Sequence, residues 1–275
     1  MNLKPLILSL LVFMTARVFS QTIGDVQMDE RSLYAMTKQM GQFISRFNHE
    51  EDQFGKRIRP DSKSFRDNKQ RRKSITTLFD KDFYNQTPLT KTFIDDITNP
   101  DSAAYMEFLG GRWYSEVSAT FTYNNKDVEM ILFLTLEKAG KGSEWVLTNV
   151  LTDIFTDKFF ECPDTLRNTN FLHPMSHEID FMNIYKIFHD PTLIECYAPS
   201  SYSPDFLTLF FYEVKNGRLQ FKNVNSLKFH VFQIRDWYFE VSWFDRKGNN
   251  SGWLISNLMQ MPESEKSWII KYYQP

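Results

Sequence analysis

A segment of six residues occurs twice in this chain of 275 residues, and that repetition limits the possible folds more than any other feature. Residues 113–118 read WYSEVS and residues 237–242 read WYFEVS, so five of the six positions agree at a spacing of 124 residues. Each copy is followed by a polar turn, a mainly apolar segment, a second turn and a further tryptophan, which is Trp145 or Trp268. The repetition predicts one α+β unit used twice, with the first residues of the two copies, and these two later tryptophans, at equivalent positions of superposable sheets.

The repeated segment has the residue pattern of a β-strand. Between residues 113 and 121 the odd positions are mostly apolar and the even positions mostly polar, as in an antiparallel strand with one buried face. Asn124 and Asn125 suit a tight hairpin turn, because Asn tolerates a positive φ. Residues 215–218, KNGR, predict a second hairpin. In the second half of the chain we expect strands at residues 206–214, 219–221, 226–234, 237–245, 252–260 and 267–273.

Helices are expected to cover the two sheets. Apolar residues recur at steps of three and four in residues 29–48, and a similar pattern begins near Ser176 and stops at Pro191. The predicted fold class is therefore α+β, with two related units that each pack an N-terminal helix on a curved antiparallel sheet. The predicted boundaries are 1–20 for a signal peptide, 21–158 for the first unit, 159–172 for a linker and 173–275 for the second unit.

The N-terminal 20 residues have the pattern of a secretory signal. Lys4 supplies a positive charge, residues 6–14 form an apolar core that is too short to span a membrane, and Gln21 is the expected first residue after cleavage. The alternative is a short membrane anchor, against which Arg17 argues. We expect an exported protein in the periplasm, at the cell surface or outside the cell, with no stable membrane span after cleavage.

The two cysteines, Cys162 and Cys196, permit one disulfide in an exported chain. The alternative is two separate buried thiols. Spacing alone does not decide between these possibilities, because it does not show whether the two Cα atoms meet.

Residues 56–73 form a basic segment, with nine Lys or Arg side chains against Asp61 and Asp67. The segment is either a site for an anionic partner, such as a polysaccharide, a lipid head group or an acidic protein face, or a solvated loop whose charge is balanced elsewhere. The chain as a whole has a net charge of −2, and the segment offers only Phe65 for base stacking. Nucleic acid is therefore not an expected partner.

No motif of known catalytic chemistry occurs in the sequence. There is no nucleophile elbow, phosphate loop, Cys–His pair or zinc-binding helix, so we expect no catalytic residue and no cofactor. His173 and His177 are four residues apart, but Pro174 displaces the first from a helix and no third ligand is specified. We therefore expect surface histidines there and no metal site.

The candidate binding residues lie on the predicted strands, and they are Tyr114, Glu116, Tyr238, Glu240 and His230. Glu116 and Glu240 occupy equivalent positions of the repeat. Each is either a base that faces an apolar cavity or one half of a cross-strand pair with a Lys or Arg. His230 either lines a cavity or is a histidine whose hydrogen bonds are satisfied within the fold.

A helical start followed by a long antiparallel sheet, carried here by residues 113–151 and 206–273, resembles the nuclear transport factor 2-like (cystatin-like cone) family in tandem. The combination of an export signal with no catalytic motif also resembles uncharacterised secreted bacterial proteins. The family resemblance does not select one function, because that family includes enzymes, small-molecule binders and interaction modules. We therefore expect an exported, non-enzymatic protein that binds an unknown protein, glycan or small molecule. The alternative is an enzyme or small-ligand carrier that uses the cavity of one unit.

Overall fold

A computed structural model describes residues 40–52, 55–82, 87–140, 142–159, 161–172, 184–246 and 250–274. The predicted signal peptide, most of the helix expected at 29–48, and the pair His173 and His177 lie outside these ranges. Residues 40–47, the described end of that expected helix, are helical.

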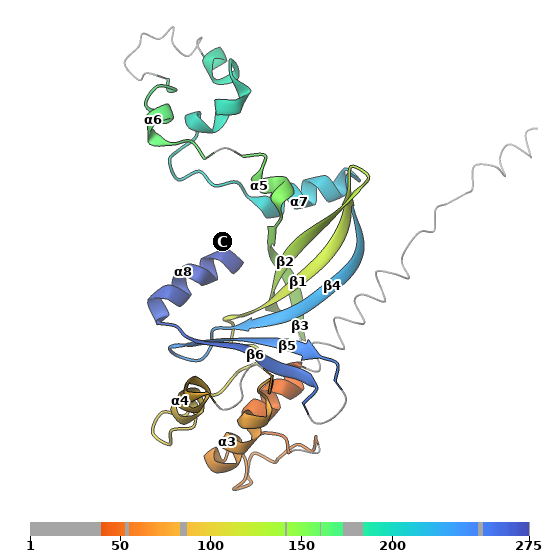
Figure 1. The fold of residues 1–275 in the computed structure, drawn as a ribbon, viewed down its shortest axis with the longest axis vertical. Helices are drawn as coiled ribbons and strands as arrows, with labels where there is room; N and C mark the ends of the chain where they lie inside the picture. Colours follow the sequence, from red (N-terminus) through yellow and green to blue (C-terminus); the bar gives the residue numbers. More distant parts are fainter. Residues whose placement is uncertain are drawn as a thin grey trace, which may run out of the picture.

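The strands form one six-stranded antiparallel sheet in the order β3-β2-β1-β4-β5-β6 (Figure 1). The strands are β1 Trp113–Tyr123, β2 Lys126–Ala139, β3 Gly142–Leu151, β4 Leu219–Val231, β5 Trp237–Phe244 and β6 Gly252–Gln260. The longer helical elements are α3 Asn68–Thr77, α4 Pro88–Ile97, η2 Pro191–Tyr197, α7 Phe206–Lys215 and α8 Glu263–Tyr273, and the short ones are α5 Asp153–Thr156 and α6 Asp164–Arg167. The α+β class with an antiparallel sheet is confirmed.

The hairpin between β1 and β2 forms where the sequence predicts it. Asn124 and Asn125 have φ values of 50° and 61°, and the strands pair from Tyr123 opposite Lys126 onward. Two successive positive φ values are the geometry whose twist matches that of the flanking strands. The local turn chemistry therefore sets the register of this strand pair.

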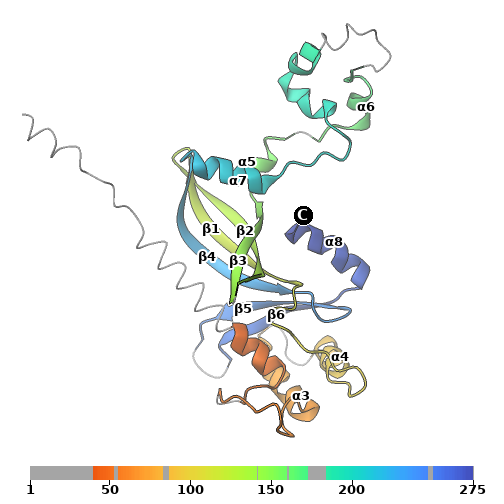
Figure 2. The same cartoon turned by 180° about the vertical axis from the view of Figure 1, so that it is seen from behind.

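Helices cover both faces of the curved sheet (Figures 1 and 2). The helix at residues 40–47, with α3 and α4, packs against the face that carries Trp113 and Trp237, which are 1% and 2% exposed. Further along the same face, α5 and α7 cover a second apolar cluster, in which Phe121 and Phe210 meet edge to face with ring centroids 5.6 Å apart. The opposite face packs against α8.

The prediction of two units, each with its own sheet, is not confirmed, because β1 and β5 are strands of the same sheet. Both strands run antiparallel to β4, which lies between them, and Val231 pairs with Trp113 on one side and with Phe239 on the other. The two copies of the repeated segment are thus separated by one strand, and one copy is displaced by two residues along the strand direction relative to the other. A displacement of two preserves which side chains point to which face.

Two segments that were expected to be strands are helices. Residues 206–214 lie in α7, where the side chain of the N-cap residue Asp205 accepts a hydrogen bond from the Thr208 amide, and residues 267–273 lie in α8. The 215–218 segment is therefore the turn from α7 into β4, and the predicted hairpin there is wrong. The predicted equivalence of Trp145 and Trp268 is also wrong, because Trp145 lies in β3 whereas Trp268 is on α8 and 77% exposed.

An arm projects from the sheet between α5 and α7 (Figures 1 and 2). Its described residues are 157–159, 161–172 and 184–204, which include α6 and η2 and the segment that was expected to be a linker. Cys162 and Cys196 form a disulfide within the arm, with Cα atoms 5.1 Å apart, so the first of the two alternatives for these cysteines is confirmed. The Arg167 guanidinium donates hydrogen bonds to the carbonyls of Cys196 and Ala198, which ties α6 to η2.

Candidate functional site

The five candidate binding residues all lie on the face of the sheet that packs against α8. Strand alternation directs the even-numbered residues of β1, β4 and β5 to this face. Tyr114 is paired with His230, and His230 is paired in turn with Glu240. Because β1 and β5 pair with opposite edges of β4, equivalent residues such as Glu116 and Glu240 lie on opposite sides of His230. The pairing of the strands therefore converts two local motifs into one cluster.

Four of these residues form a continuous chain of hydrogen bonds. Nε2 of His230 lies 2.8 Å from a carboxylate oxygen of Glu116, and Nδ1 lies 2.8 Å from the hydroxyl of Tyr238. The Tyr238 hydroxyl donates to a carboxylate oxygen of Glu240 at 2.7 Å. His230 is 2% exposed, so its ring has no access to water as an alternative partner.

The direction of the hydrogen bonds at His230 depends on which ring nitrogen carries a proton. When Tyr238 donates its proton to Glu240, its oxygen can only accept, so Nδ1 of His230 donates to it. A proton passed from Nδ1 to the Tyr238 oxygen, with the hydroxyl proton passed on to Glu240, would reverse both bonds. This is the geometry of a proton relay.

Lys228 brings a positive charge to both carboxylates of the cluster. Its ammonium lies 3.2 Å from Glu116 and 3.8 Å from Glu240. Burial raises the pKa of Glu116, but the hydrogen bond and charge of His230 and the charge of Lys228 outweigh it, so the pKa lies below its usual value. The expectation of a cross-strand pair with a Lys or Arg is met by Lys228, which the sequence analysis did not select.

Aromatic rings enclose one side of the cluster. Tyr273 of α8 stacks on Tyr114 at 5.2 Å and lies 5.0 Å from the ring of His230, and Phe232 contacts Tyr238 at 4.9 Å. Burial raises the pKa of Tyr114, Tyr238 and Tyr273, and the hydrogen bond to Glu240 raises that of Tyr238 further. The three phenols are therefore neutral at physiological pH.

The position of α8 over these aromatic rings is fixed by contacts at both ends of the helix. The ammonium of Lys266 is fully buried, donates to the carbonyls of Phe232 and Ile234, and pairs with Glu263 at 2.8 Å. Glu263 also pairs with Arg112 at 2.7 Å. At the other end, Thr148 and Asn149 of β3 donate to the last carbonyls of the helix, each at 2.7 Å.

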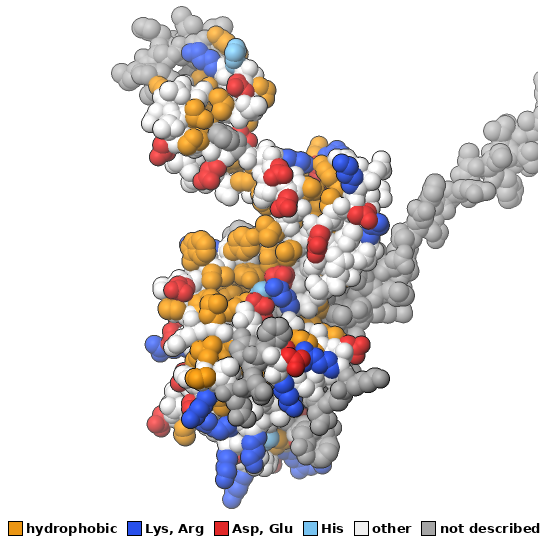
Figure 3. Space-filling model, viewed as in Figure 1, with side chains coloured by type: hydrophobic (Ala, Val, Ile, Leu, Met, Phe, Trp, Pro, Cys, Tyr) orange, Lys and Arg blue, Asp and Glu red, His pale blue; other side chains and the backbone are white. Residues whose placement is uncertain are grey.

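The cluster reaches solvent through its charged ends. Side-chain exposure is 16% for Glu116, 20% for Glu240 and 35% for Lys228. In Figure 3 a hydrophobic patch covers the middle of the visible face, and a small group of acidic, basic and histidine side chains lies next to it. The site is thus a shallow polar patch beside an apolar wall. Its open end can hydrogen-bond to a polar group.

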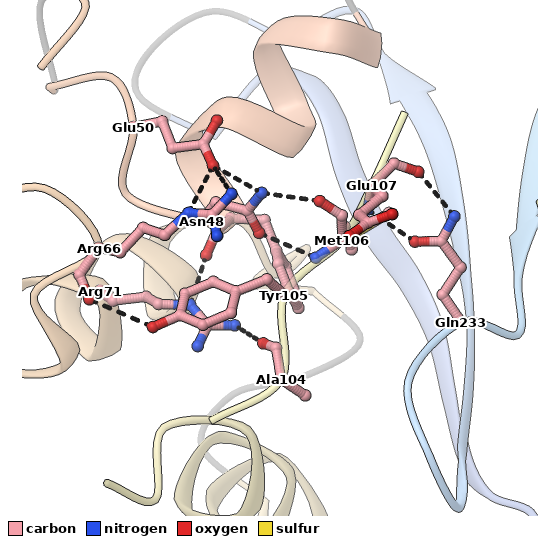
Figure 4. Close-up of polar contacts among 10 residues, drawn as sticks. Asn48, Glu50, Arg66, Arg71, Ala104, Tyr105, Met106, Glu107 and Gln233 are labelled. Carbon is pink, nitrogen blue, oxygen red and sulfur yellow. Dashed lines mark hydrogen bonds and ion pairs between the residues drawn. The ribbon is translucent and has the colours of Figure 1, made fainter. Parts of the chain in front are cut away.

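A second polar network links the helix layer to the segment that precedes β1, residues 104–107 (Figure 4). The Asn48 side chain exchanges two hydrogen bonds with the Met106 backbone, at 2.8 and 2.9 Å, and also donates to Glu50. Arg66 forms two hydrogen bonds with the same Glu50 oxygen, at 2.8 and 2.6 Å. Arg71 is fully buried and donates to the carbonyls of Phe47 at 2.9 Å, Ile97 at 2.7 Å and Ala104. The polar groups of this network form hydrogen bonds to the backbone and an ion pair with each other, so the network is structural.

Two hollows among the described residues are open to the surface. One is lined by four residues of α8, Ser264, Glu265, Trp268 and Ile269, and another lies between residues 41–57 and 106–108. Within the described ranges, no group of three or more His, Cys, Asp or Glu side chains is placed to hold a metal ion. No helix in the same ranges is both long and apolar enough to cross a bilayer.

No protein family, curated protein or solved structure matches this chain.

Proposed function

We propose that the chain is an exported, non-enzymatic interaction protein that binds its partner through the arm. The observation that carries this proposal is the apolar surface of the arm. Seven large apolar side chains there are 37–62% exposed, and they are Phe171, Leu172, Ile184, Tyr185, Phe188, Ile194 and Tyr202. Exposed aromatic and aliphatic side chains that gather on one part of a surface are typical of a site for another macromolecule.

The interior of the molecule supports the same function. The core between the helices and the sheet is filled with large side chains, including Phe47, Phe93, Trp113, Phe229 and Trp237. A ligand carrier of this size would need a concave, mostly apolar cavity with a few polar groups. The hollows described above are instead open and lie at the surface.

Export is part of the proposal. It rests on the signal-like pattern of residues 1–20 and on the disulfide between Cys162 and Cys196. Disulfides persist in oxidising compartments and are rare in a reducing cytosol. N-terminal sequencing of the native protein should begin at or near Gln21, and an intact Met1 on the mature protein would exclude cleavage.

The arm can be tested against another exposed apolar surface of the same molecule. Mature protein with Tyr185→Ser and Phe188→Ser is compared with a Phe221→Ser control, because Phe221 is 46% exposed on β4, which is outside the arm. Cross-linking in the exported fraction should give a specific product with the wild type and with the control variant, and not with the arm variant. The same product from all three proteins would contradict a role for the arm.

A second candidate function uses the hydrogen-bonded chain from Glu116 to Glu240. A proton relay with partly exposed carboxylates favours the alternative, a carrier or enzyme for a small polar molecule. In that case a ligand found by thermal-shift screening should raise the melting temperature of the wild type but not that of Glu240→Gln. The resemblance to the nuclear transport factor 2-like family stays a proposal and fits either candidate function, because that family includes enzymes, small-molecule binders and interaction modules.

A further inference from the structure

The basic segment separates into cations that hold the fold together and cations that are free. Arg71 is buried on three backbone carbonyls, Arg66 pairs with Glu50, and Arg72 pairs with Asp95. These three cations are used within the fold. The segment is also not one loop, because α3 begins at Asn68 and includes its last six residues.

The remaining six cations are all exposed, and we refer to them as the basic pole: Lys56, Arg57, Arg59, Lys63, Lys69 and Lys73. In the part of the chain that the structure describes, none of them forms an ion pair. The two acidic residues of the segment do not offset them. Asp61 is a single exposed carboxylate, and Asp67 is the N-cap of α3, where it accepts a hydrogen bond from the Gln70 amide.

The positive charges gather at one end of the molecule. Figure 3 shows basic side chains at the end formed by α3 and the loop before it, opposite the end that carries the arm. Six uncompensated cations in a chain of net charge −2 make a local field that the total charge conceals. Because salt screens fields beyond about 10 Å, a partner must contact the pole directly to use this field.

We propose that the basic pole binds an acidic polysaccharide. Among the described residues from 55 to 82 there is no exposed large hydrophobic side chain, so nothing in the pole would insert into a bilayer. Phe65 is half-buried with the Arg66 guanidinium 5.3 Å from its ring centre, so the pole has no free aromatic face for bases. A hydrated polymer of carboxylate or sulfate groups needs only exposed cations.

The way the pole is held supports a polymer with regularly spaced charges. The backbone of α3, which carries Lys69 and Lys73, is held by Arg71 on the adjoining helices and by the Asp67 cap. In the loop before it, the Asp52 amide donates to the Lys56 carbonyl at 2.9 Å and the Ile58 amide donates to the Glu50 carbonyl at 2.8 Å. Lipids in a fluid bilayer rearrange around any set of cations, whereas a polysaccharide carries anions at fixed intervals. A fixed array therefore favours the polymer, because less conformational freedom is lost on binding.

The test compares two variants with the same change in net charge. The pole variant carries Lys63→Glu, Lys69→Glu and Lys73→Glu. The control variant carries glutamate at three exposed lysines outside the pole, which are Lys126, Lys138 and Lys186. The probes are polygalacturonate, dextran sulfate, neutral dextran and phosphatidylglycerol vesicles, and binding is measured by light scattering or calorimetry at several salt concentrations.

Wild type and control should bind at least one acidic polymer, more weakly as salt increases, and should not bind neutral dextran. The pole variant should bind at least about tenfold more weakly, with a smaller salt dependence. An unchanged melting temperature of the pole variant shows that it is folded. Equal loss of binding in both variants, no binding of either acidic polymer, or binding of the vesicles alone would overturn the proposal. The arm variant should bind the polymers like the wild type, which separates this proposal from the one above.

Discussion

Arg71→Met is expected to lower the free energy of unfolding by about 4 kcal/mol. Methionine keeps most of the volume of the buried stem and removes the three hydrogen bonds to the carbonyls of Phe47, Ile97 and Ala104. Phe47 and Ile97 are the last residues of two helices, whose final carbonyls have no partner within the helix. The cation also lies where the two helix dipoles are negative, which favours positive charge.

The magnitude follows from two opposing effects. A hydrogen bond from a charged donor contributes about 1.5 to 3 kcal/mol, so three contribute about 4.5 to 9 kcal/mol. Burial lowers the pKa of Arg71 from 12.5 to about 10, which leaves the group charged at pH 7. That shift corresponds to a cost of about 3 kcal/mol for the charged form. The difference is centred near 4 kcal/mol.

Urea unfolding followed by tryptophan fluorescence measures the effect, and Arg72→Met is the matched control. Arg72 is the next residue of the same helix, but its pair with Asp95 is nearly half exposed on both sides, so its loss should cost less than about 1 kcal/mol. Arg71→Lys should lie between wild type and Arg71→Met, because one ammonium cannot reach three divergent carbonyls. A cost below about 1 kcal/mol for Arg71→Met, or equal costs for both Met variants, would refute the structural role of the guanidinium.

Four further outcomes are expected. Tyr238→Phe should cost about 1–3 kcal/mol in urea unfolding, because it leaves a buried ring nitrogen without its partner; an unchanged midpoint would exclude the hydrogen-bonded chain. Burial raises the pKa of Glu263, but hydrogen bonds from Lys266 and Arg112 bring it from 4.5 to about 2. The native carboxylate therefore binds its proton more weakly than the unfolded one, and its contribution is complete above pH 4.5 and lost as the pH falls toward 2. Since this side chain is 39% exposed, Glu263→Gln should cost only about 1 kcal/mol at pH 7, and a difference that persists near pH 2 would contradict the assignment. Loss of the disulfide by Cys162→Ser with Cys196→Ser should lower stability by up to about 4 kcal/mol and expose the arm to proteolysis, whereas equal cleavage rates would show that the bond does not hold it. Trp237→Ala should cost about 3–5 kcal/mol in the same unfolding assay, and a smaller loss would mean that its core site collapses around the truncation.

Features that depend on neighbouring residues could be predicted from the sequence. The alternation in residues 113–121 predicts a strand and its buried face, and Asn124 with Asn125 predicts the hairpin, because strand period and turn chemistry are local. The same alternation placed Tyr114, Glu116, Tyr238 and Glu240 on the polar faces of their strands. That much of the candidate site needed no knowledge of the fold.

Two segments whose residue pattern fits both a strand and a helix were predicted as strands, although they are helices. Residues 206–215 are apolar on several sides, so their pattern fits a strand or a helix, and the choice falls to the Asp205 cap and the packing of Phe210 on Phe121. In α8, Pro262 followed by Glu263 and Glu265 was a usable signal for a helix start. The alternation of apolar residues after them obscured it.

Whether the repeated segments share one sheet was decided only by the tertiary structure. Each copy satisfies the same local rules in one sheet or in two, and the deciding contact is the pairing of β1 with β4, which joins Trp113 to Val231 across more than a hundred residues. Such pairings depend on the whole packed arrangement, because loop closure over that length must be offset by burial elsewhere. The same pairing brought Lys228 to Glu116 and placed His230 between the two carboxylates. The local pattern determined which residues face the site, and long-range strand pairing determined that they meet.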